Sequence, residues 1–150
     1  MSYRESVWDY PRPPVVEPST ERIKVVFNGR VIADSSAGYR VLETSHPPAY
    51  YFPPEDVIPG ALSPVEKVTF CEYKGAANYC DVMVDTRVAR AAAWRYLDPA
   101  PGYEAIRGYL AFYPAKMDEC WVGEQLVEPQ RGSFYGGWIT PGIIGPFKAG

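Results

Sequence analysis

The high proline content constrains the fold of this chain more than any other feature. The 150 residues include 16 Pro and 13 Gly. A proline ring removes a backbone donor and clashes with the preceding turn, so prolines in this number break helices. The chain also has 12 Tyr, a residue that favours half-buried strands and pocket walls. We therefore predict a mostly β protein.

An Asn-Gly pair gives the clearest local prediction. Asn28 and Gly29 stand between the β-branched segments 23–27 and 30–34. Both residues tolerate the positive φ angles of a tight hairpin turn, and the flanking segments have strand composition. The sequence predicts a β-hairpin here.

The remaining elements follow from alternation and from breaks at Pro and Gly. We interpret residues 62–66 as a connector. Residues 88–96 are ambiguous, because Ala91–Ala93 favour a helix whereas Trp94 and Tyr96 alternate as in a strand, and we favour a strand for the end of this segment. The other predictions are strands at 39–43, 67–71, 79–84 and 109–113, an extended piece at 49–52, and one helical turn each at 53–57 and 104–107.

The turn between the predicted strands 67–71 and 79–84 carries an unusual set of reactive groups. Cys71, Glu72 and Lys74 place a thiol, a carboxylate and an ammonium within four residues. Perturbed and reactive groups gather at functional sites. The turn is therefore the best candidate for ligand recognition or chemistry.

Cys71 and Lys74 each admit two interpretations. Lys74 would favour a nucleophilic thiolate at Cys71, with Glu43 or His46 as the proton-transfer partner, although most free cysteines are buried and inert. Lys74 beside Gly75 is a candidate for binding an anion such as phosphate, although a solvated turn is the more common role of such a lysine.

A metal site and a cofactor site are not predicted. Cys71, Cys80, Cys120 and His46 have the ligand types of a zinc centre, but no C-x-x-C knuckle is present. The chain also lacks the glycine-rich loops of common nucleotide sites. We predict no metal and no cofactor.

Composition narrows the classes of partner. The net charge is −3 with a pI near 5.2, which does not suit nucleic-acid binding. No apolar run approaches the length of a signal peptide or a membrane span, and an odd number of cysteines, three, fits reduced thiols. We expect a cytoplasmic protein without nucleic-acid or membrane partners.

The chain length fits one domain, since 150 residues can bury roughly two-thirds of the unfolded surface. We divide it into a proline-rich arm (residues 1–20), a β body (21–118) and a Gly-, Pro- and aromatic-rich C-terminal extension (119–150) with its aromatic centre at 134–140. The arm is either a free polyproline ligand for another protein or a clasp that lays Trp8 and Tyr10 on the body, and we favour the clasp.

Six motifs are spread along the chain. They are Asn28-x-Arg30-x-Ile32-Ala33-Asp34-Ser35, Val41–Thr44, Tyr51–Val57, Thr69-x-Cys71-x-Tyr73-Lys74-Gly75-x-Ala77-x-Tyr79, Ala92-Ala93-Trp94-x-Tyr96 and Ile106-x-Gly108-Tyr109-x-Ala111-Phe112-Tyr113. Together they resemble a known family, the domain of unknown function catalogued as number 427. The resemblance covers roughly residues 24–118, and the arm and the extension look like a longer subgroup. It implies a small domain of two antiparallel sheets in a tent-like arrangement, and it carries a nucleotidyltransferase-like label. Glu72 and Cys80 depart from the family pattern, which often has Pro and a bulky aromatic residue there.

The leading functional expectation is a small-molecule pocket between two sheets, with aromatic walls and a few polar groups. One alternative is a small enzyme that acts on a nucleotide or another phosphorylated metabolite through Cys71 or Glu43. Another is an interaction module, such as a homodimer, that uses the arm and the extension. The predicted walls are Tyr50, Tyr79, Trp94, Tyr113 and Trp138, and the predicted polar groups are Glu43, His46, Cys71 and Lys74.

Overall fold

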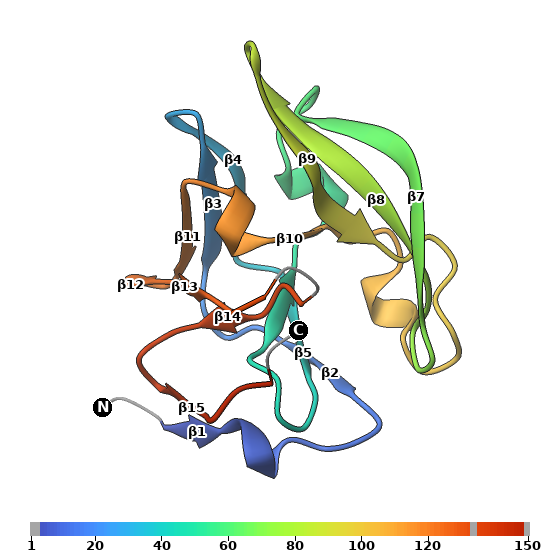
Figure 1. The fold of residues 1–150 in the computed structure, drawn as a ribbon, viewed down its shortest axis with the longest axis vertical. Coiled ribbons are helices and arrows are strands. Elements are labelled where there is room, and N and C mark those ends of the chain that lie inside the picture. The colour runs from blue at the N-terminus through green and yellow to red at the C-terminus, as the bar shows by residue number, and fades with distance from the viewer. Residues whose placement is uncertain (1–3, 133–134, 149–150) are drawn as a thin grey trace.

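Two four-stranded antiparallel sheets dominate the computed structural model, which describes residues 4–132 and 135–148 (Figure 1). Their strand orders are β10-β9-β8-β7 and β12-β11-β3-β4, and smaller sheets have the orders β2-β5-β6, β1-β15 and β13-β14. The strands are β1 (Glu5–Ser6), β2 (Val15–Pro18), β3 (Ile23–Phe27), β4 (Arg30–Ser35), β5 (Tyr39–Leu42), β6 (Ala49–Tyr51), β7 (Leu62–Cys71), β8 (Gly75–Val84), β9 (Arg87–Arg95), β10 (Ala111–Phe112), β11 (Glu119–Val122), β12 (Gln125–Leu126), β13 (Glu128–Pro129), β14 (Trp138–Ile139) and β15 (Ile143–Ile144).

The mostly β prediction is confirmed. Helical structure in the described ranges is limited to short 3-10 turns. Two of them, η2 and η3, lie inside the segments predicted to form helical turns, and η2 opens on proline as expected. The turns are η1 (Val7–Asp9), η2 (Pro54–Asp56), η3 (Glu104–Ile106) and η4 (Pro114–Lys116). Within the described part of the chain, no helix has the length and apolar character needed to cross a membrane.

The predicted Asn-Gly hairpin is present between β3 and β4. Phe27 pairs with Arg30 across the turn, and Asn28 and Gly29 have φ angles of 51° and 74°. Two successive positive φ angles match the twist of the flanking strands. Asp118 and the Val84 carbonyl also accept hydrogen bonds from Asn28, at 2.6 and 3.1 Å, so tertiary contacts support the turn.

The prediction of a connector at 62–66 is wrong. These residues form the first half of β7, where Leu62 pairs with Val82 and Pro64 with Cys80. Proline has no backbone N–H to donate to a neighbouring strand. β7 is at the edge of its sheet, where Pro64 is tolerated. The register shifts between Pro64 and Val68, which hides the alternation expected of a long strand.

The ambiguous segment 88–96 is a strand for nearly its whole length. β9 contains the alanine run, and Ala91 has a φ of 47° where the register with β8 shifts. Asp81 holds this irregularity, because its Oδ1 accepts a hydrogen bond of 2.7 Å from the Ala91 N–H. The strand predicted at 109–113 is shorter than expected, since β10 covers only Ala111–Phe112.

The strand β8 has two apolar faces. Cys80 and Val82 pack in one cluster with residues of β3 and β4, whereas Ala77 and Tyr79 pack in another with residues of β5 and β6. Alternation along a strand sends neighbouring side chains to opposite faces. The β10-β9-β8-β7 sheet is therefore covered on both sides, and its second face is rich in aromatic side chains.

The arm lies on the body. Val7 is completely buried and Tyr10 is 8% exposed, and both cluster with Leu42. Trp8 is 54% exposed, although its indole N–H donates a hydrogen bond of 2.9 Å to the Pro146 carbonyl. Tyr10, rather than Trp8, supplies the buried aromatic contact.

A cluster of charged residues fixes the arm to β5. Arg40 donates two hydrogen bonds, of 2.7 and 2.8 Å, to the two carboxylate oxygens of Glu5, and a third of 2.7 Å to Glu17. The Tyr10 hydroxyl donates to Glu5 at 3.0 Å. The hydrogen bonds from Arg40 lower the pKa of Glu5 below its ordinary value of 4.5.

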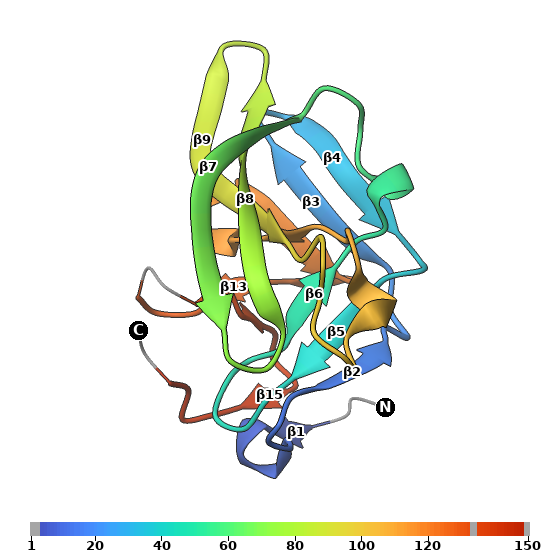
Figure 2. The ribbon, with the colours of Figure 1, turned by 90° about the vertical axis from the view of Figure 1, so that its right-hand side faces the viewer.

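The C-terminal extension returns to the body. β11 pairs with β3, with Cys120 opposite Val25, and the chain then runs past the β5–β6 turn (Figure 2). Trp138 donates its backbone N–H to Pro48 O at 2.8 Å. Phe134, the first residue of the predicted aromatic centre, is outside the described residues.

We expect Arg40→Met to lower the free energy of unfolding by about 2 kcal/mol at pH 7, because charge-assisted hydrogen bonds contribute about 1.5–3 kcal/mol. Chemical denaturation measures the change. Arg22→Met is the matched control: it removes the same group from an exposed pair with Asp34, and its effect should be smaller.

The same cluster predicts a pH dependence. A lowered pKa in the folded state stabilises the protein above the unfolded pKa, near 4.5 for Glu5, and this stability is lost as the pH falls through the folded pKa. The difference in unfolding free energy between wild type and Glu5→Gln should therefore be complete at pH 7 and shrink below pH 4.5. A constant difference across this range would contradict the assignment.

Candidate functional site

A cavity of about 510 Å³ lies between the β7–β8 turn, the β5–β6 region, the arm and the C-terminal extension. These segments all lie toward the lower end of the molecule in Figures 1 and 2. The lining combines aromatic walls with ionisable groups. The aromatic members are Tyr51, Phe70, Tyr73, Tyr79, Trp94, Tyr96, Tyr113 and Tyr135, and the charged or titratable members are Arg12, Glu43, His46, Cys71, Glu72, Lys74 and Lys148.

The aromatic wall is a connected set of rings. Tyr79 and Tyr113 are nearly parallel with their centroids 6.5 Å apart, and Trp94 lies 4.7 Å from Tyr113. Hydroxyl groups join the rings: Tyr79 and Tyr113 share a hydrogen bond of 3.4 Å, and the Trp94 indole donates to the Tyr51 hydroxyl at 3.3 Å. The wall offers flat apolar faces with polar edges, which suits a planar ligand.

Burial controls the charge of this wall. Loss of hydration raises the pKa of Tyr51, Tyr96 and Tyr113 well above the usual value for a phenol. The three hydroxyls are therefore neutral at physiological pH and keep their protons for hydrogen bonding. An anionic ligand meets no negative charge on this wall.

Lys74 is buried at the turn between β7 and β8. Cys71 pairs with Gly75, so three residues form the turn, and Gly75 has a φ of 104° that favours glycine. The Lys74 carbonyl accepts a 2.8 Å hydrogen bond from Ala100, which anchors the turn. The Lys74 side chain is directed inward, and the residue is only 8% exposed.

The Lys74 side chain has no salt-bridge partner among the described residues. Its Nζ lies 5.9 Å from the centroid of the Tyr96 ring. Buried charges are usually paired because dehydration is costly. The solvated-turn interpretation of Lys74 therefore does not fit this structure.

Glu43 and His46 occupy one turn after β5. The His46 N–H donates to the Glu43 carbonyl at 3.1 Å, and the imidazole lies 4.6 Å from the Tyr135 ring. Burial lowers the pKa of His46; Lys148, Lys74 and Arg12 lower it further, whereas Glu43 opposes them. Three cationic groups thus act on one imidazole.

The three cysteines occupy different environments. Cys71 is partly exposed and lines the cavity, whereas Cys80 and Cys120 are buried in the core between the two four-stranded sheets. Burial raises the pKa of both core thiols. The four residues considered as zinc ligands are therefore divided between the core and the cavity, and the described residues contain no cluster of three metal-ligating groups.

Seven of the nine predicted site residues line the cavity together. They come from four different parts of the fold, and long-range pairing brings them together. They are Glu43, His46, Cys71, Lys74, Tyr79, Trp94 and Tyr113.

Tyr50 and Trp138 do not line this cavity. Trp138 is 1% exposed in the core, where its indole donates to the Phe112 carbonyl at 3.1 Å. The Tyr50 ring packs 5.2 Å from Trp138 and borders a second cavity. Successive residues of a strand face opposite sides, so Tyr51 faces the first cavity and Tyr50 does not.

The second cavity is larger, at about 780 Å³, and lies on the other side of β5 and β6. Its main cation is Arg40, which is already paired with Glu5 and Glu17. A group whose hydrogen bonds are satisfied gains little from a ligand. The smaller cavity therefore has the stronger chemical features.

The sequence interpretation missed four important lining residues. Tyr96 was identifiable, because it alternates with Trp94 on the same strand face. The position of Tyr51 in the lining depends on the register of β5 and β6, in which Tyr51 pairs with Tyr39. The sequence around Arg12 and Lys148 does not indicate that these residues line the cavity, because only tertiary packing brings the arm and the extension there.

These features define a small mostly β domain with buried aromatic clusters beside a cavity. The chain belongs to the family described as Domain of unknown function (DUF427), whose model matches residues 15–123. No curated protein matches the chain in sequence. Arg12 and all lining residues after Gly123 lie outside the matched segment.

His46 provides a direct test of this geometry, because it is the only histidine in the chain. We expect its pKa to lie below 6.5, to rise in Lys148→Ala and to fall in Glu43→Gln, since these variants remove a neighbouring positive and a neighbouring negative charge. Proton NMR of the imidazole across pH measures each value.

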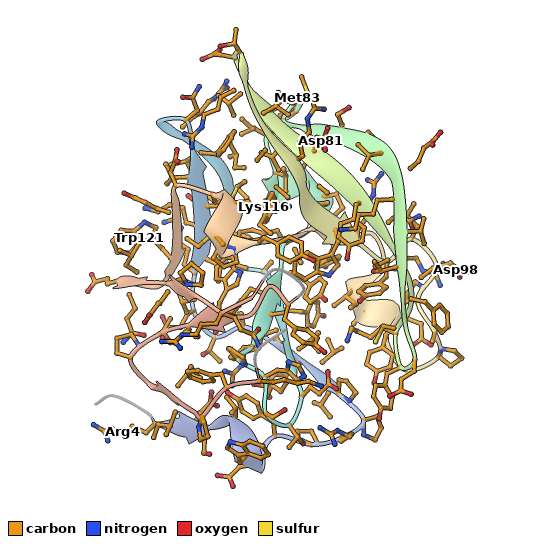
Figure 3. All side chains as sticks on the ribbon, in the orientation of Figure 1. Arg4, Asp81, Met83, Asp98, Lys116 and Trp121 are labelled. Atoms are coloured by element: carbon orange, nitrogen blue, oxygen red, sulfur yellow. The ribbon has the colours of Figure 1, made fainter. Side chains whose placement is uncertain are left out.

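Lys24→Ala is the control for this titration. Lys24 lies 5.6 Å from the Trp121 ring, and Figure 3 places Trp121 on the outer side of its sheet, away from the β7–β8–β9 sheet. This variant should leave the His46 titration unchanged. A wild-type pKa at or above 6.5 would show that the imidazole is not buried among these cations.

Proposed function

We propose that this domain binds a small anionic molecule in the aromatic cavity. The observation that carries the proposal is Lys74, a lysine that is only 8% exposed and has no salt bridge among the described residues, in the wall of a cavity of about 510 Å³. A ligand anion would supply the missing counter-charge and offset the cost of dehydration.

The other lining groups support a ligand with a flat apolar part. Trp94, Tyr79 and Tyr113 offer ring faces, while Glu43, Cys71 and neutral phenols offer polar contacts. Small-molecule sites usually have this composition, in which apolar walls give affinity and a few polar groups fix orientation. The cavity volume lies within the range typical of such sites, about 300–1,000 Å³.

Lys74→Met should weaken binding of the probe benzenesulfonate by at least about tenfold, because a charge-assisted hydrogen bond contributes about 1.5–3 kcal/mol. Isothermal titration calorimetry measures the affinity. The free energy of unfolding should fall by no more than about 1 kcal/mol, since methionine fills similar space without a charge to dehydrate.

Two controls make this experiment specific. Lys24→Met removes an ammonium on the outer side of the β3–β4–β11 sheet and should leave affinity unchanged. Benzyl alcohol, a neutral probe, should bind weakly and equally to wild type and Lys74→Met. Equal benzenesulfonate affinity in both lysine variants would overturn the proposal, and a large loss of stability in Lys74→Met would assign the lysine a structural role instead.

A second candidate function is chemistry at Cys71 on a ligand held in the same cavity. The observation that favours it is position: Cys71 lines the cavity with Lys74, Glu43 and His46, whereas Cys80 and Cys120 are 0% and 2% exposed. A thiol that shares a cavity with an ammonium and a proton acceptor is a candidate nucleophile.

Alkylation with iodoacetamide tests this accessibility. In the native protein, we expect one adduct per chain, at Cys71, because the alkylating agent cannot reach the two core thiols. Mass spectrometry counts the adducts, and the Cys71→Ser variant should not form this adduct. Equal rates at all three cysteines would remove the support for a specific Cys71 site.

A further inference from the structure

We propose that the ligand is an aromatic phosphate monoester, and that Arg12 and Lys148 at the cavity rim select its double negative charge. This inference rests on the proposed binding function and names the ligand class. It depends on two parts of the chain outside the family-matched segment 15–123.

The rim is made by segments that are far apart in the sequence. Arg12 comes from the arm and Lys148 from the C-terminal extension, and both residues are exposed. Lys74, in contrast, is buried in the wall. Exposed cations at the mouth and a buried cation inside form an electrostatic funnel that attracts anions.

Both rim segments are held in place by hydrogen bonds. On the arm, the Pro11 carbonyl accepts from the Thr44 N–H at 3.2 Å, and the Pro14 carbonyl accepts from the Tyr103 hydroxyl at 2.7 Å. At the extension, the Lys148 N–H donates to the Ser45 carbonyl at 2.8 Å. The backbones that carry the rim cations are thus both attached to the segment just before His46, which favours binding by reducing the ordering cost.

The cations of the lining outnumber its carboxylates. Lys74, Arg12 and Lys148 line the cavity together with two acidic residues, Glu43 and Glu72. Glu72 is exposed in the β7–β8 turn, whereas Glu43 and the three cations all act on His46. A phosphate monoester carries a charge of about −1.5 to −2 at pH 7 and accepts several charge-assisted hydrogen bonds. It would therefore gain more from the three cations than a carboxylate or sulfonate, which carries a single charge.

The aromatic part of the ligand follows from the wall. The Trp94 and Tyr113 rings lie 4.7 Å apart, and Gly136 packs so closely on both that a Cβ atom there would lie 2.6 Å from Trp94 and 3.1 Å from Tyr113. The extension therefore covers part of this aromatic surface and forms one boundary of the space that a flat ligand would occupy. The same segment of the chain shapes the apolar surface and supplies Lys148.

The test compares phenyl phosphate, benzenesulfonate and inorganic phosphate by calorimetry at about pH 8, where the phosphate monoester is nearly doubly charged. We expect wild type to bind phenyl phosphate roughly tenfold more tightly than either other probe. Arg12→Gln and Lys148→Gln should each weaken phenyl phosphate binding by roughly fivefold and benzenesulfonate binding by roughly twofold. Lys24→Gln, the control for charge, should change neither affinity.

The outcomes separate this inference from the proposed function. Benzenesulfonate binding that depends on Lys74 but equals phenyl phosphate binding would overturn the dianion while preserving an anionic ligand. Inorganic phosphate that binds as tightly as phenyl phosphate would overturn the aromatic part. Absence of binding by all three probes would overturn both proposals.

The His46 proton signal verifies that each rim variant retains the folded cavity. A rim variant that folds but keeps full selectivity for phenyl phosphate would contradict the assigned role of that residue.

Discussion

The strand β8 carries the constraint on which the rest of the molecule depends, because both of its faces are buried. Cys80 and Val82 join the core shared with β3 and β4, and Tyr79 joins the aromatic cluster beside the cavity. Displacement of this strand by one residue would exchange its two faces. The packing that stabilises the protein therefore also fixes the orientation of the ring at the site.

The fold was predictable where local chemistry decides the conformation. Asn28 and Gly29 define their hairpin by their tolerance of positive φ, which is a local property of the two residues. The first half of β7 was not predictable, since its strand conformation depends on pairing with β8 beyond a register shift. The alanine run of β9 likewise takes its irregular form from Asp81, a residue on the neighbouring strand.

The candidate site was predictable to a similar extent and for the same reason. Cys71 and Lys74 are close in sequence and belong to one turn, so their proximity follows from a local pattern. The choice between Tyr50 and Tyr51 requires the register of β5 and β6, which the sequence alone does not give. Arg12 and Lys148 reach the cavity only through tertiary contacts of the arm and the extension.

The hydroxyl groups of the aromatic wall have a consequence for recognition. Either oxygen can be the donor in the hydrogen bond between Thr69 and Tyr79, and the same is true between Tyr79 and Tyr113. Rotation of the hydroxyl hydrogens reverses these bonds without moving a heavy atom. In the proposed complex, the wall could thus present a donor to one ligand group or an acceptor to another without a change in the positions of its heavy atoms.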